Sequence, residues 1–161
     1  MTPAHPPAAG PLSGIRVVDL TQVVSGPAAM GTLASQGAEV IKVEALSGDV
    51  TRRSRQKSPG FAPSYIACNS GKQAIALDLK NPATTDILWR LIERADVFAQ
   101  NFRPGAIERL GFGAEAVMAR NPKLVYLSIN GVGETGPYAS KRVYDPIIQA
   151  LSAVSYTHLT L

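Results

Sequence analysis

Histidine is scarce in this 161-residue chain, and its absence excludes several kinds of catalytic site. Only His5 and His158 occur, one near each end. The region between them therefore has no imidazole for a general base, a Ser-His-Asp triad or a His-ligated metal, and we expect no metal site. Any chemistry in this region must depend on carboxylates, backbone dipoles or cations.

Cysteine and long apolar runs are also nearly absent. Cys68 is the only cysteine, so no internal disulfide can form, which is typical of a protein of the reducing cytoplasm. No apolar run approaches the about eighteen residues of a membrane-spanning helix, and we expect no membrane partner. Residues 1–11, MTPAHPPAAGP, hold no charged side chain and no apolar block, which indicates a disordered tail rather than a signal peptide.

Acidic residues are fewer than basic ones, and the excess is partly local. The chain has 16 Lys and Arg against 12 Asp and Glu, a net charge of +4. Residues 51–57, TRRSRQK, hold four of the cations. Such a run is typical of a solvated loop, a phosphate-bearing small-molecule site or a nucleic-acid contact. Because no RNA or DNA motif and no interleaved aromatic residues accompany it, we expect no nucleic-acid partner.

Strand and helix patterns alternate along the rest of the chain. Short apolar runs predict strands at 15–20, 38–44, 74–79, 97–101 and 123–129. Helical patterns follow at 28–36, 81–94 and 116–120, with a short helix after residue 105 and a last helix from residue 145. Ser25 is the expected cap of the first helix, and Pro27 lies in its first turn. The alternation predicts an α/β fold, a Rossmann-like parallel sheet with helices on both faces and ligands at the carboxyl ends of the strands.

A dinucleotide site is disfavoured by the turn after the first strand. Residues 21–27, TQVVSGP, contain one glycine, whereas the pyrophosphate-binding fingerprint requires three. Glu44 does end the second strand, where a ribose-binding acid would lie. A phosphate-binding P-loop is absent altogether.

The segment ADVFAQNFRPGAIERLGFG, residues 95–113, contains a strand, a polar and aromatic strand end, a Pro-Gly turn and a short helix. This order predicts that an amide, a ring and two guanidinium groups surround one strand terminus: Asn101, Phe102, Arg103 and Arg109.

Seven blocks of the chain, in order and in spacing, resemble the class III coenzyme A transferases. They are GIRVVDLTQVVSGP, GAEVIKVE, SGD with TRR, NSGKQAIALDLK, ADVFAQNFRPGAIERLGFG, NPKLVYLSINGVGETGPY and VYDPIIQALS. That family contains formyl-CoA, carnitinyl-CoA and succinyl-CoA transferases, with alpha-methylacyl-CoA racemases as relatives. The resemblance covers residues 11–152. It implies that residues 12–153 form the N-terminal portion of a Rossmann-like large domain, in a longer protein with a smaller second domain that assembles as an interlocked homodimer.

The resemblance also implies a binding site for coenzyme A or an acyl-CoA. The matching positions are Gln22, Val23, Ser25, Leu77, Lys80, Asn101, Phe102, Arg109 and Arg142. The loop 22–25 would line the thioester end, Asn101 and Phe102 would lie beside the CoA moiety, and Arg109 and Arg142 would reach its phosphates. Fork-shaped guanidinium donors and aromatic rings suit the phosphates and the adenine.

Several of these residues also have an ordinary structural interpretation. Phe102 could belong to the core, and Arg109 could be a surface helix residue. Lys80 could be a solvated strand end, and Gln22 could be a loop amide.

The family resemblance implies CoA transfer between an acyl-CoA and a small carboxylic acid through an aspartyl intermediate. The nucleophilic aspartate is expected beyond Leu161, so we expect no catalytic residue in the chain. Tyr144-Asp145 stands where the racemases have a histidine before an aspartate, which favours a transferase over a racemase-like enzyme. A non-catalytic nucleotide-binding domain is the third alternative. Asp145 is expected to orient the neighbouring loop or cap the last helix rather than to act as nucleophile.

The chain departs from the family pattern in three places. Ala45-Leu46 follows the VIKVE strand where many members have a basic residue, which Arg52, Arg53 or Arg55 could replace. Gln22 stands where formyl-CoA transferase has a histidine, which weakens an assignment to that substrate. Residues 154–161, VSYTHLTL, read like translated sequencing adapter, and we expect the natural sequence to end near residue 153; the alternative is a divergent C-terminal strand.

Overall fold

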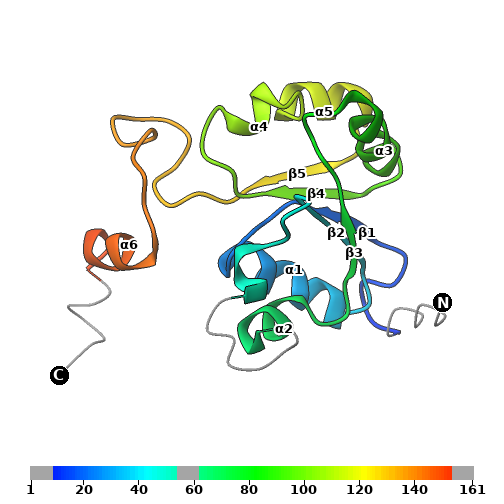
Figure 1. Cartoon of the computed structure of the whole chain (residues 1–161), viewed down its shortest axis with the longest axis horizontal. Helices are drawn as coiled ribbons and strands as arrows, with labels where there is room; N and C mark the ends of the chain where they lie inside the picture. The colour runs from blue at the N-terminus through cyan, green and yellow to red at the C-terminus, as the bar shows by residue number, and fades with distance from the viewer. Residues whose placement is uncertain (1–8, 54–61, 154–161) are drawn as a thin grey trace.

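The computed structural model describes residues 9–53 and 62–153 (Figure 1). The expectations for most of the N-terminal tail, for Arg55 and for the tail at 154–161 therefore lie outside the described residues.

The centre of the molecule is a parallel sheet of five strands in the order β3-β2-β1-β4-β5. The strands are β1 (Arg16–Asp19), β2 (Glu39–Glu44), β3 (Gln73–Ala76), β4 (Val97–Gln100) and β5 (Val125–Ser128). This confirms the predicted α/β fold and all five strands. The strand order reverses between β1 and β4, so the carboxyl ends of these two strands border the point where open α/β sheets bind ligands.

Six α-helices and a short 3₁₀ turn connect and follow the strands of the described chain. They are α1 (Ser25–Ser35), η1 (Val50–Arg53), α2 (Pro63–Asn69), α3 (Pro82–Ile92), α4 (Ala106–Arg109), α5 (Ala114–Arg120) and α6 (Asp145–Leu151). Two of these elements, η1 and α2, lie between the strands predicted at 38–44 and 74–79, where no helix was predicted. The role of Ser25 was also wrong: Val24 occupies the cap position, and Ser25 is the first helical residue.

Helices cover both faces of the sheet, as Figure 1 shows: α1 and α2 lie on one face and α3, α4 and α5 on the other. Successive strand residues point to opposite faces. Val17 therefore packs with Met30 of α1, and its neighbour Val18 packs with Leu88 of α3. Because both faces are covered, the strands are apolar without strict alternation.

The turn before α3 shows how local sequence sets a helix boundary. The side chain of Asn81 accepts a hydrogen bond from the backbone N–H of Ala83, and Pro82 occupies the first helical position, where no N–H is required. The start of the helix predicted at 81–94 is therefore confirmed, with Asn81 as its cap.

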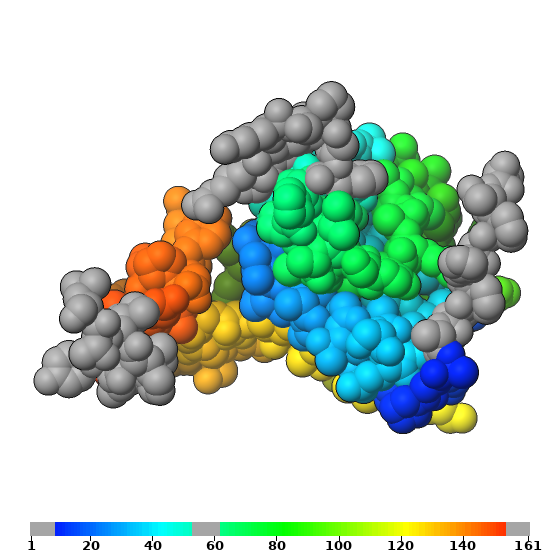
Figure 2. Space-filling view, turned by 90° about the horizontal axis from the view of Figure 1, so that it is seen from below, coloured from blue at the N-terminus to red at the C-terminus, as the bar shows by residue number. Residues whose placement is uncertain are grey.

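The C-terminal segment, residues 130–153, extends away from the sheet (Figures 1 and 2). Its helix α6 buries none of its residues among the described parts of the chain. Tyr144 precedes this helix, and Asp145 Oδ2 accepts a hydrogen bond from Gln149 Nε2 within it. Asp145 is thus engaged in its own helix.

Candidate functional site

The carboxyl ends of β1 and β4 are joined by the side chain of Asn101. Its Oδ1 accepts a hydrogen bond from the backbone N–H of Gln22, and its Nδ2 donates to the backbone carbonyl of Gln22, both over 2.8 Å. The structure therefore brings together two predicted site residues, one from the loop after β1 and one from the loop after β4. Both ends of the Asn101 amide are engaged by the backbone of Gln22.

The next residue in the β1–α1 turn has an unusual backbone. Val23 has a φ of 72°. This left-handed conformation is a genuine outlier for a β-branched residue. Val23 is 37% exposed, and Ser25 is exposed at the start of α1. The turn therefore presents these two predicted site residues to solvent at the point where the strand order reverses.

A basic pocket of about 360 Å³ lies next to the end of β4. Its lining combines two segments that are distant in sequence, the loop and helix after β4 and the segment before α6. The residues are Arg103, Pro104, Arg109, Ala139, Ser140, Lys141 and Arg142. Four of these seven are cations, so the pocket suits a ligand with several negative charges. Two predicted site residues, Arg109 and Arg142, share this pocket.

The remaining predicted site residues lie in different surroundings. Phe102 is half-buried against the core on the α3 side, and its backbone N–H donates to Gln100 Oε1. Leu77 is 4% exposed and belongs to the same core. Lys80 is exposed in the turn after the edge strand β3, where its backbone N–H donates to Asp78 Oδ1. Phe102 thus adjoins Asn101, whereas Leu77 and Lys80 follow β3, two strands away from β1.

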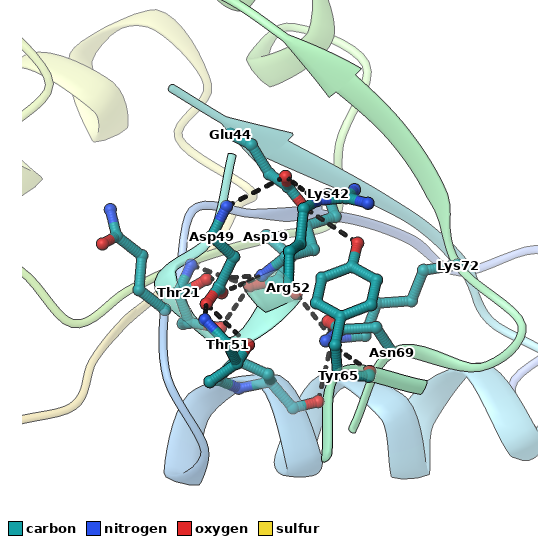
Figure 3. A network of polar contacts seen from close by, with 12 residues as sticks. Asp19, Thr21, Lys42, Glu44, Asp49, Thr51, Arg52, Tyr65, Asn69 and Lys72 are labelled. Atoms are coloured by element: carbon teal, nitrogen blue, oxygen red, sulfur yellow. Dashed lines mark hydrogen bonds and ion pairs between the residues drawn. The ribbon is translucent and has the colours of Figure 1, made fainter. Parts of the chain in front are cut away.

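A network of buried polar side chains lies beneath the β1–α1 turn, on the face of the sheet that α1 and α2 cover (Figure 3). Lys72 is its first centre, with a side chain that is 1% exposed. Its Nζ lies 2.9 Å from Asp19 Oδ2, 2.8 Å from the Pro27 carbonyl and 2.9 Å from Asn69 Oδ1. Burial lowers the pKa of Lys72, and the charge of Asp19 opposes this shift. The three acceptors match the three N–H groups of an ammonium ion.

Lys42 is the second centre of this network. It occupies β2 with a side chain that is also 1% exposed, and its Nζ lies 3.2 Å from Asp49 Oδ2. The same ammonium group donates to the backbone carbonyl of Thr21 over 2.8 Å. The N–H and hydroxyl groups of Thr21 in turn donate to Asp19 Oδ1. The network therefore holds the residue at which the β1–α1 turn begins.

Glu44 at the end of β2 is also fully engaged. Arg52 donates to both of its carboxylate oxygens, at 2.6 and 2.9 Å, and the hydroxyl of Tyr65 donates over 2.8 Å. Burial alone would raise the pKa of Glu44, but these hydrogen bonds and one from the backbone of Asp49 lower it. Glu44 is thus unavailable for a ribose. Arg52, which also lies over the Tyr65 ring, is half-buried in this cluster instead of free for a ligand.

Three carboxylates lie near the point where the strand order reverses, and all three are bound to other groups. Asp19, Glu44 and Asp49 are buried, and each accepts a hydrogen bond from a neighbouring side chain and forms an ion pair with a cation. Within 9–53 and 62–153, no group of three or more His, Cys, Asp or Glu side chains could hold a metal ion. In the same ranges, no helix is long and apolar enough to cross a membrane.

Comparison with known proteins identifies the family. Residues 12–160 match the model of CoA-transferase family III. The chain belongs to CoA-transferase family III. The resemblance inferred from the seven sequence blocks is therefore confirmed.

Curated relatives of this family III chain are named as CoA-transferases. A formyl-CoA:oxalate CoA-transferase of Streptomyces coelicolor is 44% identical over 87% of the chain and 34% of its own length. An acetyl-CoA:oxalate CoA-transferase of Acetobacter aceti is 41% identical over 95% of the chain and 39% of its own length. A succinate–glutarate CoA-transferase of Agrobacterium fabrum is 43% identical over 88% of the chain and 38% of its own length. The chain thus spans between one third and two fifths of these relatives.

Solved structures show the same fold. A CAIB/BAIF family protein from Brucella suis superposes with a TM-score of 0.86 at 38% identity, covering 91% of this chain and 40% of that protein. The protein Rv3272 of Mycobacterium tuberculosis gives a TM-score of 0.86 at 37% identity, covering 94% of this chain and 43% of that protein. The family III chain therefore adopts the fold of its relatives over nearly its whole length.

Sequence reasoning missed the two buried lysines and their partners. A signal was present, because Lys42 interrupts the apolar strand EVIKVE, and a charge inside a strand covered on both faces requires a partner. The partner Asp49 lies in a loop, and the sequence pattern contains no indication of that pairing.

Proposed function

We propose that this chain is the CoA-binding portion of a CoA-transferase that moves coenzyme A between an acyl-CoA donor and a small carboxylic acid acceptor. The observation that carries the proposal is the basic pocket. Arg103, Arg109, Lys141 and Arg142 line one cavity beside the end of β4. Coenzyme A carries several phosphate charges, and guanidinium groups can bind phosphate oxygens through two parallel hydrogen bonds.

The orientation of the bound carrier follows from the position of this pocket. With the phosphates in the pocket and Phe102 beside the adjoining strand end, the pantetheine arm would run toward the β1–α1 turn at the switch point. Gln22, Val23 and Ser25 would then adjoin the thioester. Lys80, exposed after β3, would contribute at the far side of the turn, next to Leu77, whose side chain packs in the core.

The transfer chemistry requires a carboxylate nucleophile. An aspartate attacks the donor acyl carbonyl, the C–S bond breaks, and CoA leaves as the thiolate, which leaves the acyl group on the aspartate as a mixed anhydride. The thiolate attacks the aspartyl carbonyl, which releases the donor acid and forms an aspartyl thioester. The acceptor carboxylate then attacks the aspartyl thioester and releases the thiolate, which forms a new anhydride between the acceptor and the aspartate. The thiolate attacks the acceptor carbonyl of this anhydride, which forms the new acyl-CoA and releases the aspartate.

We infer that this aspartate belongs to a part of the whole protein outside the chain. The inference is supported by Asp19, Glu44 and Asp49, whose carboxylates are buried and engaged by cations or hydroxyl groups. A carboxylate in such contacts is a weak nucleophile because attack would break them. The three named relatives are longer, and the chain spans at most two fifths of each. This agrees with the inference.

Titration calorimetry of the full-length gene product with CoA tests the site. Arg109→Ala and Arg142→Ala are each expected to raise the Kd for CoA about tenfold, because each removes a charge-assisted contact to phosphate. Pantetheine, which lacks the phosphates, should bind the variants and the parent equally. Arg90→Ala, on the exposed side of α3, is the matched control.

An unchanged Kd in both pocket variants, or an equal loss in Arg90→Ala, would contradict the assignment. Transfer itself is measured by the appearance of a labelled acceptor as its CoA ester. If the enzyme instead exchanges the α-proton of a 2-methylacyl-CoA with deuterium oxide and needs no acid acceptor, the racemase-like alternative replaces the transferase.

A further inference from the structure

We propose that Asn101 is a positioning residue, which holds the strained Gln22–Val24 turn in place for the thioester end of CoA. The proposal rests on the proposed function and concerns the same site. It assigns to the Asn101 amide a role that acts through the backbone of the turn.

The strain lies in one residue of the turn. Val23 has a φ of 72°, in a region that L residues with a side chain populate roughly tenfold less readily than the right-handed region. A β-branched side chain is among the least suited to it. Such a conformation persists only where the surrounding contacts determine it.

Contacts on both sides of Val23 supply that constraint. Before it, the two 2.8 Å hydrogen bonds between Asn101 and the backbone of Gln22 fix the peptide that leads into the turn. After it, Gly26 packs against Thr21 so closely that a Cβ atom at Gly26 would lie 2.3 Å from Thr21 Cβ. Lys42 holds the carbonyl of Thr21 from below. The turn is thus clamped between β1, β4 and the start of α1.

Asn101 is the contact in this clamp that can be removed most cleanly. It is half-buried and neutral, whereas Lys42 is buried and paired with Asp49. Without the Asn101 amide, Val23 can relax to a negative φ and carry Gln22 away from its place at the end of β1. A displaced Gln22 would leave the thioester misplaced, which slows the transfer step more than it weakens CoA binding, because the phosphates still hold CoA in the basic pocket.

The test uses the full-length gene product at saturating acyl-CoA. Asn101→Ala is expected to lower kcat about tenfold while the Kd for CoA changes less than twofold. In a Val23→Gly background the same substitution should lower kcat by at most about threefold, because glycine adopts positive φ without strain and no longer drives the turn to relax. This dependence on residue 23 is a result that a general loss of stability would not produce.

The matched control is Asn121→Ala. Asn121 Nδ2 also braces backbone carbonyls, those of Ile92 and Ala95, at 2.9 and 2.8 Å, but at the opposite edge of the sheet, where β4 begins. This substitution should leave kcat unchanged. If Asn101→Ala fails to fold, Asn101→Asp, which still accepts from the Gln22 N–H, should show a smaller loss of kcat with the same dependence on residue 23.

Two results would overturn the proposal. A tenfold rise in Kd with unchanged kcat in Asn101→Ala would make the amide a direct CoA contact. An equal fall in kcat with valine and with glycine at position 23 would remove the link to strain. Failure of the parent protein to bind CoA or transfer it would overturn the proposed function as well, so the two failures are distinguishable.

Discussion

Replacing Lys72 with methionine tests whether the buried polar network stabilises the fold. Lys72→Met removes the ammonium group but keeps much of the side-chain volume. Three acceptors then lose a donor: Asp19 Oδ2, the Pro27 carbonyl and Asn69 Oδ1. The side chain of Asp19 is 0% exposed, so its carboxylate would remain as an uncompensated buried charge.

The expected cost follows from that burial. Removing one partner of a buried ion pair costs about 3–5 kcal/mol, against a total stability of about 5–15 kcal/mol for a domain. At about 2–4 °C per kcal/mol for a chain of this size, the melting temperature should fall by roughly 6–20 °C. Replacing Asp19 with asparagine in the same variant removes the unpaired charge and should recover about 2 kcal/mol.

Urea unfolding at pH 7 followed by circular dichroism measures these differences. The control is Arg16→Met, which breaks the cross-strand ion pair with Glu39, whose side chains are 37% and 31% exposed. An exposed pair contributes about 0–1 kcal/mol, so this variant should unfold close to the parent. If Lys72→Met costs no more than Arg16→Met, or if Asp19→Asn adds to the loss, the network does not stabilise the fold as described.

Three further predictions concern other parts of the chain. Gly26→Ala should cost about 1–3 kcal/mol in urea unfolding, because its Cβ would lie 2.3 Å from Thr21 Cβ; a neutral result would mean that the turn can yield. The folded pKa values of Glu44 and Asp49 are lowered, so their contribution to stability is fully present above their unfolded values near 4 and is lost as pH falls through the folded ones. The urea concentration at the unfolding midpoint should therefore decrease as the pH is lowered below about 4, and it should decrease less steeply in Glu44→Gln. An identical pH dependence in the parent and the variant would refute this. Asn81→Ala should lower the free energy of unfolding by about 1 kcal/mol, and Asn81→Ser should restore most of it if the cap is the cause.

Local patterns were sufficient for most of the helices and strands. The apolar residues within IRVVDL and EVIKVE predicted β1 and β2, because a short run rich in valine and isoleucine is typical of a strand covered on both faces. The Asn81-Pro82 pair predicted the start of α3 because a cap depends on residues only two positions apart. The same reasoning failed at Ser25, a residue type that commonly caps helices, because α1 begins one residue earlier than expected, with Val24 at the cap position.

The helix α2 was missed because it follows a basic, Pro- and Gly-containing stretch that suggested a loop. Proline at its first helical position was the available signal. Its buried residues Tyr65 and Asn69 serve the polar network, with the Tyr65 hydroxyl on Glu44 and the Asn69 amide oxygen on Lys72. An apolar periodicity search does not detect a helix whose buried residues are polar.

The sequence by itself determined the alternation of strands and helices and the sheet they form, because these depend on patterns within a few residues. It also determined the family, through the order and spacing of seven blocks over residues 11–152. Tertiary structure decided which charges are buried and which share a pocket. Lys42 contacts Thr21 and Asp49, and Arg109 and Arg142 line one pocket, only when the chain is folded. Whether a cation faces water, a carboxylate or a ligand depends on distances between segments far apart in the chain, and those distances exist only in the folded protein.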